Sequence, residues 1–122
     1  MNQRVLLIGL RADAVDYEKW DKLSPEKLEA AFTEVITELE EAGYQPQWCL
    51  TDTGATACEQ IQSALKETEP EIVLIGAGVR ADGANLFLFE KVINLVHEHA
   101  PQAKICFNRL PYDSLDAVKR WS

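Results

Sequence analysis

Three arginines are the side chains of this sequence best suited to bind a ligand. Arg11, Arg80 and Arg109 each follow an apolar run, and the chain has only five arginines among 12 basic and 20 acidic residues. A guanidinium group presents a planar fork of N–H donors that suits a phosphate or a carboxylate. These arginines predict a binding pocket for a small anionic metabolite. The alternative is that they pair with Asp13, Asp82 and Asp113 on a solvated rim.

A glycine motif follows the third apolar run. Gly76, Gly78 and Ala81 fit the pattern G-x-G-x-x-A that holds the pyrophosphate of a dinucleotide, and Arg109 would then suit the 2′-phosphate of NADP. However, residues 82–85 interrupt the helix that should begin within the motif. The alternative is a glycine turn that lets a loop pass close to the sheet edge.

A second motif, Thr-Asp-Thr-Gly-Ala-Thr at residues 51–56, resembles the phosphate loop of flavodoxins. In flavodoxins that loop follows the first strand, whereas here it follows the second, and a helix-capping turn accounts for it better. Receiver domains need acidic residues where Gly9 and Gly76 stand, so that function is excluded. The cofactor is left unassigned, with a flavin- or NADP-binding oxidoreductase component as an alternative function.

The remaining reactive side chains show no catalytic or metal-binding pattern. His97 and His99 lie at a helix end, where cations are favoured. Cys49, Cys58 and Cys106 lack metal-ligand spacing, which predicts reduced thiols in a cytoplasmic protein and no metal site. Cys106 is expected to act as a small apolar residue. No Ser-His-Asp set, paired carboxylates or Walker loop is found, so the sequence does not decide whether the chain is an enzyme.

The elements that must position these residues alternate between strand and helix. Apolar runs predict strands at residues 4–10, 47–50, 72–75 and 104–107. Helical periodicity predicts four helices between and after them, the last with Leu115, Val118 and Trp121 turned inward. We expect one domain over residues 1–122, with an α/β fold of three α/β/α layers. Its sheet is doubly wound, with four parallel strands in the order 2-1-3-4, flavodoxin-like or half-Rossmann.

In such a sheet, ligands bind outside the carboxyl ends of the strands, where the strand order reverses. The segment at residues 11–23 is long for a strand–helix connection. Its Tyr17 and Trp20 would cover the site, or would simply dock the segment onto the following helix. Phe87 is expected at the mouth. The predicted ligand-binding residues are Gly9, Arg11, Asp13, Gly76, Gly78, Arg80, Asn108 and Arg109.

Two features bear on partners and location. The helix that follows Asn85 and ends near His99 is apolar over about half its circumference, through residues 86–96, which predicts a homodimer or larger homo-oligomer unless neighbouring helices cover the excess. The net charge of −8 argues against nucleic acid and anionic membranes as partners. The N-terminal apolar run is too short for a signal peptide or a membrane span.

Four segments together carry a resemblance. They are Val-Leu-Leu-Ile-Gly-Leu at 5–10, Ile-Gly-Ala-Gly-Val-Arg at 75–80, Leu-Phe-Glu-Lys-Val-Ile-Asn-Leu-Val-His-Glu-His-Ala-Pro at 88–101 and Ile-Cys-Phe-Asn at 105–108. With these segments, the chain is similar to a family of short bacterial α/β proteins of unknown function. The resemblance implies a small α/β fold and brings no activity or cofactor with it. The leading interpretation is a binding module for a small anionic metabolite; an interaction protein without a small ligand is a further alternative.

Overall fold

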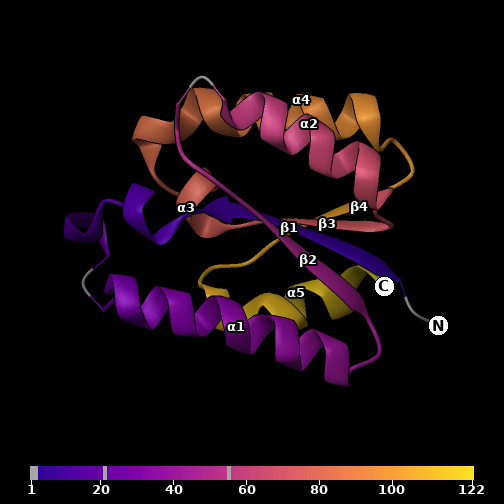
Figure 1. Cartoon of the computed structure of the whole chain (residues 1–122), viewed down its shortest axis with the longest axis horizontal. Helices are drawn as coiled ribbons and strands as arrows, with labels where there is room; N and C mark the ends of the chain where they lie inside the picture. Colours follow the sequence, from indigo (N-terminus) through magenta and orange to yellow (C-terminus); the bar gives the residue numbers. More distant parts are fainter. Residues whose placement is uncertain (1–2, 21, 55) are drawn as a thin grey trace.

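A computed structural model describes residues 3–20, 22–54 and 56–122. Its sheet has four parallel strands in the order β2-β1-β3-β4, as the sequence predicts. Figure 1 shows helices on both faces of this sheet. The strands are β1 (Arg4–Leu10), β2 (Gln45–Thr51), β3 (Ile72–Ile75) and β4 (Lys104–Phe107).

Helices alternate with the strands along the chain, and short helical turns lie at several connections. Ser24 begins α1, where its side chain accepts a hydrogen bond from the N–H of Lys27. The helices are α1 (Pro25–Glu41), α2 (Ala57–Thr68), α3 (Ala77–Arg80), α4 (Leu86–His99) and α5 (Ser114–Trp121). The 3-10 turns are η1 (Ala12–Ala14), η2 (Tyr17–Lys19), η3 (Gly83–Asn85) and η4 (Pro111–Asp113).

The side chains of the central strand β1 point alternately into two hydrophobic cores, one on each face of the sheet. Leu6 and Ile8 pack with residues of α2 and α4, whereas Val5 and Leu7 pack with residues of α1 and α5. Successive side chains of a strand point to opposite faces, so a wholly apolar strand serves both layers. The result is three α/β/α layers, with α1 and α5 on one face and α2 and α4 on the other (Figure 1).

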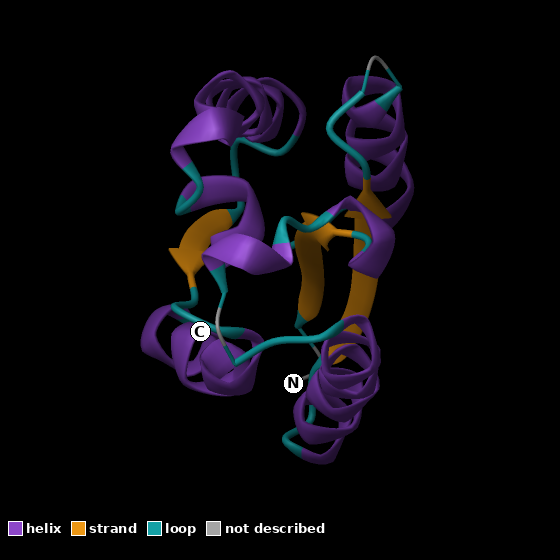
Figure 2. Cartoon of the chain, turned by 90° about the vertical axis from the view of Figure 1, so that its left-hand side faces the viewer, coloured by secondary structure: helices purple, strands orange, loops and turns teal. Residues whose placement is uncertain are grey.

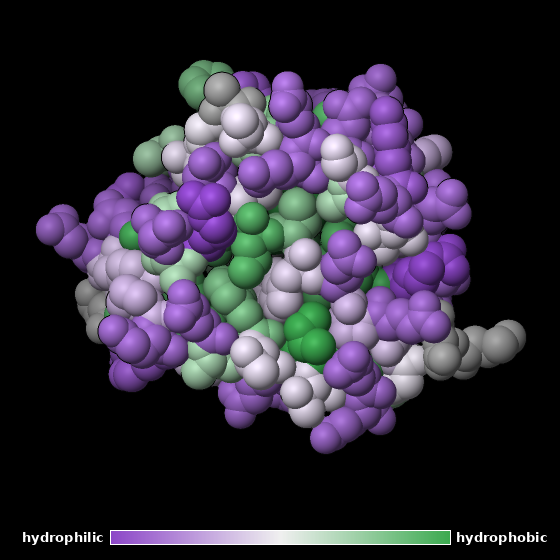
Figure 3. All heavy atoms as spheres, in the orientation of Figure 1, coloured by the Kyte–Doolittle hydropathy of each residue, from purple (hydrophilic) through white to green (hydrophobic). Residues whose placement is uncertain are grey.

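The edge strand β2 is longer than the predicted range of residues 47–50. It begins at Gln45 and includes Pro46, which pairs in register with Val5. Proline lacks a backbone N–H and is tolerated at the edge of a sheet, where one side of the strand needs no partner. Figure 3 shows apolar side chains reaching the surface along this edge, between the two helix layers.

One inward position predicted from periodicity is wrong. Trp121 is 53% exposed, whereas Val118 is fully buried and Leu115 is packed at the margin of the core. Trp121 is the last residue of α5, beyond the part of the helix that packs on the sheet. No helix in the described ranges is long and apolar enough to cross a lipid bilayer.

Candidate functional site

The segments that follow β1, β3 and β4 meet at the carboxyl edge of the sheet. Figure 2 looks onto this edge, where α3 and short turns lie in front of the strand ends. The β1–α1 segment, residues 11–23, leads through η1 and η2. The connection after β3 forms α3 and η3, and the connection after β4 forms η4.

A cavity opens at this edge, between the ends of β1 and β3. Its volume is about 40 Å³, and about 460 Å³ of empty space is present when its open mouth is included. The smaller volume, which is the enclosed part, holds about three waters and is well below the volume of a typical small-molecule site. The walls are mostly carbon. The lining residues are Gly9, Leu10, Val15, Trp20, Leu23, Leu28, Phe32, Trp48, Gly76, Ala77, Gly78, Asn108, Leu110 and Pro111.

Five of the residues singled out from sequence line this cavity, namely Gly9, Trp20, Gly76, Gly78 and Asn108. Two of the glycines have a packing reason to be there. A Cβ on Gly9 would lie 3.3 Å from Cζ3 of Trp48, and a Cβ on Gly76 would lie 3.3 Å from the carbonyl oxygen of Ile8. Both contacts are tighter than ordinary van der Waals contact. These glycines therefore let the cavity wall approach the strands closely.

Asn108 is the one buried carboxamide in the described lining, with 3% of its surface exposed. Its Oδ1 accepts a hydrogen bond from the N–H of Ala77 at 2.9 Å, and its Nδ2 donates to Oγ of Ser114 at 3.0 Å. Ser114 in turn donates to the carbonyl of Pro111. Asn108 thus ties the first turn of α3 to the start of α5 and holds one wall of the cavity in place.

The three arginines have separate partners, and none of them lines the cavity as the structure describes it. Nε of Arg11 lies 3.1 Å from Oδ1 of Asp13, and its Nη2 lies 3.9 Å from Oδ2 of Asp52. Nε of Arg109 lies 3.3 Å from Oδ2 of Asp113, with 91% of the arginine side chain exposed. Asp13 and Asp113 are two of the three carboxylates named as alternative partners.

Arg80 is held differently. Its guanidinium carbon lies 5.5 Å from the ring centroid of Phe107, and its Nη2 donates to the carbonyl of Asn108. Its buried Nε has no hydrogen-bond partner among the residues described. The predicted partner Asp82 instead binds Lys19, with 2.7 Å between Nζ and Oδ1. Arg80 therefore serves the packing between α3 and β4.

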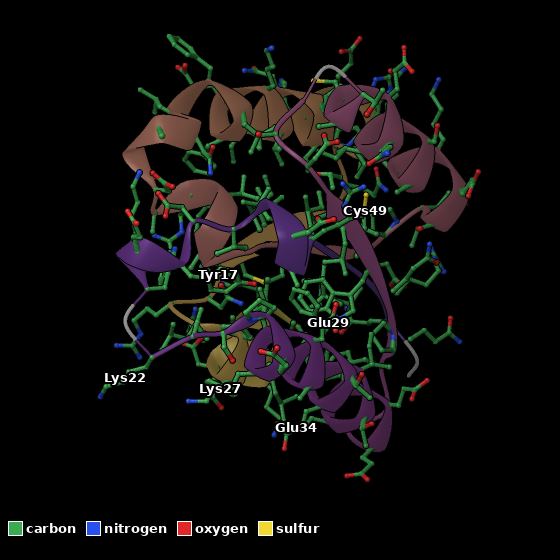
Figure 4. All side chains as sticks on the ribbon, turned by 60° about the vertical axis from the view of Figure 1, so that its left-hand side comes forward. Tyr17, Lys22, Lys27, Glu29, Glu34 and Cys49 are labelled. Atoms are coloured by element: carbon green, nitrogen blue, oxygen red, sulfur yellow. The ribbon has the colours of Figure 1, made fainter. Side chains whose placement is uncertain are left out.

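The β1–α1 segment covers the cavity through Trp20 and Leu23, while its Tyr17 lies outside the lining. The hydroxyl of Tyr17 donates to the carbonyl of Ala12 within the same segment. Burial raises the pKa of Tyr17, and nearby Glu29, Glu26 and Asp13 raise it further. Figure 4 shows Tyr17 above the N-terminal half of α1, on the side of Glu29. Trp20 thus covers the cavity, and Tyr17 braces the segment.

Phe87 does not lie at the mouth of this cavity. Its ring is 75% exposed and lines a separate groove between α2 and α4. Phe87 is the second residue of α4, which directly follows the turn η3.

Four basic residues stand directly before lining residues in the sequence, and their scattered positions did not single them out. Lys19, Lys22, Lys27 and Arg109 each directly precede a residue that lines the cavity. Lys22 and Lys27 make no ion pair with any residue the structure describes. The signal in the sequence is a basic residue followed directly by an apolar residue that lines the cavity. The lining residues that follow them are Trp20, Leu23, Leu28 and Leu110.

The two phosphate-binding motifs gain little geometric support. The helix after Gly76 has four residues and ends at Arg80, so it is too short to present a full helix terminus to a pyrophosphate. The side chain of Thr56 makes no capping bond to α2, so the capping interpretation is wrong in detail. The turn is instead held by Asp52, whose Oδ1 accepts the N–H of Gly54. Residue 55 of that motif lies outside the described residues.

Burial raises the pKa of two of the three cysteines. It raises the pKa of Cys106 to about 11 and also raises that of Cys49, which suits their place in the two cores. In the part of the chain that the structure describes, no cluster of three or more His, Cys, Asp or Glu side chains could hold a metal ion.

Fold and cavity together define a small α/β protein with a four-stranded parallel sheet and an apolar cavity at its carboxyl edge. The chain matches no known family model, and no curated protein is significantly similar to it.

Proposed function

We propose that this protein is a binding module for a small organic anion, whose apolar body enters the cavity at the carboxyl edge. The observation that supports this most directly is the cavity itself, with its carbon walls and its place where the strand order reverses. The apolar walls favour a ligand with a flat apolar part over a bare anion. Trp20, Trp48 and Phe32 supply the aromatic faces.

The anionic part of the ligand is expected at the rim. In a chain of net charge −8, four of the 12 lysines and arginines directly precede a lining residue in the sequence. Lys22 and Lys27 make no ion pair with other described residues. Arg109 is largely exposed and would turn from Asp113 at little cost. A carboxylate or phosphate outside the cavity would then meet several cations.

The β1–α1 segment must move when a ligand enters, because the closed cavity holds only a few waters. Trp20 and Leu23 would swing outward and close again over the ligand. Removal of water from the cavity walls supplies the gain in free energy, about 25 cal/mol for each Å² of apolar surface. The charged rim then selects anions.

A matched panel tests this proposal. Benzoate, phenyl phosphate and indole-3-acetate are compared with benzamide, benzyl alcohol and inorganic phosphate by thermal unfolding and tryptophan fluorescence. The aromatic anions should stabilise the protein, by about 2.7 kcal/mol at 100 times the dissociation constant. Neutral analogues and inorganic phosphate should bind at least tenfold more weakly. If no aromatic anion raises the unfolding temperature at millimolar concentration, the proposal is wrong.

Variants locate the binding. Trp20→Ala should abolish the stabilisation, because it removes the ring that covers the cavity. Trp121→Ala is the control, since Trp121 is exposed on α5 and does not line the cavity. Equal loss in both variants would place any binding elsewhere.

A further inference from the structure

Four exposed side chains form a stripe along the outer surface of α4. Phe87, Lys91, Asn94 and Glu98 are spaced by four, three and four residues, so they lie on one face of the helix. Phe87 is 75% exposed, more than any other large apolar side chain in the described ranges. The α4 stripe therefore begins with an aromatic ring that this chain leaves uncovered.

The stripe borders an open groove between α2 and α4, which pack side by side on one face of the sheet (Figures 1 and 2). The groove has a volume of about 450 Å³, and its lining includes the half-buried Cys58 and Leu95. An exposed ring next to an unfilled groove is a surface that a second helix can cover.

The charges of the stripe are complementary to themselves. Lys91 and Glu98 stand at equal distances on either side of the midpoint between Asn94 and Leu95. A two-fold axis at that midpoint, with two α4 helices antiparallel, places each Lys91 against Glu98 of the second copy. Two chains of net charge −8 repel each other, so a contact that matches opposite charges is the one that permits self-association.

We propose that the α4 stripe is a two-fold interface, at which this chain binds a second copy of itself. Asn94 and Leu95 lie at the centre of this interface, at the two-fold axis. Phe87 of each copy lies over the C-terminal end of the other α4, near the exposed Pro101. The inference does not depend on the cavity at the carboxyl edge, because the α4 stripe shares no residue with its lining.

Charge-reversal variants test the proposed two-fold interface. Sedimentation equilibrium from 1 to 200 micromolar should show that the wild-type chain is a dimer at tens of micromolar. Lys91→Glu and Glu98→Lys should each raise the dissociation constant at least tenfold, because like charges then oppose each other twice. An equimolar mixture of the two variants should restore the dimer, since every opposed pair is again of opposite charge. Glu34→Lys, on the exposed face of α1, is the control for Glu98→Lys, since it changes the net charge by the same amount.

A second pair of variants tests the apolar end. Phe87→Ser should dissociate the dimer, and Trp121→Ser, which removes another exposed aromatic side chain from α5, should not. A wild-type chain that stays monomeric at 200 micromolar overturns the proposal. So does a mixture of the charge variants that stays monomeric, or dissociation by Trp121→Ser in place of Phe87→Ser.

Discussion

Nζ of Lys19 lies 2.7 Å from Oδ1 of Asp82, and this ion pair joins the segment after β1 to the segment after β3. Asp82 is 9% exposed, and its Oδ1 also accepts a hydrogen bond from the N–H of Ala84. This second hydrogen bond holds the carboxylate in place beside Lys19. The pair therefore joins the β1–α1 segment, which covers the cavity, to the residue that caps the turn η3. In the proposed binding, the β1–α1 segment would have to break or move this contact when the cavity opens.

Lys19→Met should loosen the β1–α1 segment, because methionine keeps an apolar stem and loses the ion pair. We expect faster hydrogen exchange at residues 17–20, measured by mass spectrometry, and a lower stability at neutral pH. Lys22→Met is the control, since Lys22 makes no ion pair with the described residues. Equal exchange in the two variants would contradict a fastening role for Lys19.

The effect of Lys19→Met on stability should depend on pH. The hydrogen bond from Lys19, followed by that from the Ala84 N–H, lowers the pKa of Asp82 below its ordinary 3.8. A lowered carboxyl pKa stabilises the fold above pH 3.8, and that contribution is lost as the pH falls through the lowered value. The hydrogen bond that Lys19 donates to Asp82 raises the pKa of Lys19 above 10.5, so the pair persists through neutral pH. The difference in stability between wild type and Lys19→Met should therefore be constant from pH 5 to 9 and shrink below 3.8.

Gly76→Ala should destabilise the fold. Its Cβ would lie 3.3 Å from the carbonyl oxygen of Ile8, which also accepts the N–H of Gly76 at 2.8 Å and so cannot retreat. Overpacking of this kind costs about 1–3 kcal/mol, measured by urea unfolding. Gly83→Ala is the matched control, since nothing lies within 4 Å of its added Cβ. A stable Gly76→Ala protein would show that β1 and α3 can separate.

The sheet could be predicted from sequence because its central strands, β1 and β3, consist almost entirely of buried apolar residues. Every residue of β3 is buried, and so are six of the seven residues of β1, so each reads as an unbroken apolar run. The edge strand β2 was harder, because its burial alternates and Pro46 interrupts the pattern. The alternation of helices and strands then predicted that the strands of the sheet run parallel.

The cavity was only partly predictable. The rule that ligands bind at the switch point pointed to Gly9, Gly76, Gly78 and Asn108, all of which line it. Phe32 and Trp48 were missed because α1 and β2 carry them as ordinary core positions, and only the packing of Trp48 against Phe32 turns them to the cavity. The partners of the arginines depend on side-chain rotamers, which spacing does not encode.

Arg80→Ala should lower the free energy of unfolding by about 1–3 kcal/mol. The substitution removes a charged hydrogen bond to the carbonyl of Asn108 and the contact of the guanidinium with the ring of Phe107. Arg80→Lys should recover part of this loss, since a lysine keeps the charge without the planar group. Arg109→Ala is the control, because its side chain is 91% exposed and its removal should change stability by less than about 0.5 kcal/mol. If Arg80→Ala is as stable as Arg109→Ala, the stacking on Phe107 contributes nothing.

Thiol labelling should distinguish the three cysteines. Burial raises the pKa of Cys106 to about 11 from an ordinary 9.0, and the protein around it also shields its sulfur, with only 1% of the residue exposed. At pH 8 the thiolate fraction of Cys106 is then about a hundredfold lower than that of an ordinary cysteine. Iodoacetamide should therefore modify the partly exposed Cys58 first and reach Cys106 only when the fold opens. Peptide mass spectrometry over a time course measures the rates, and urea above the unfolding midpoint should make them equal. Labelling of native Cys106 as fast as Cys58 would show that β4 opens readily, which its burial between β3 and α5 argues against.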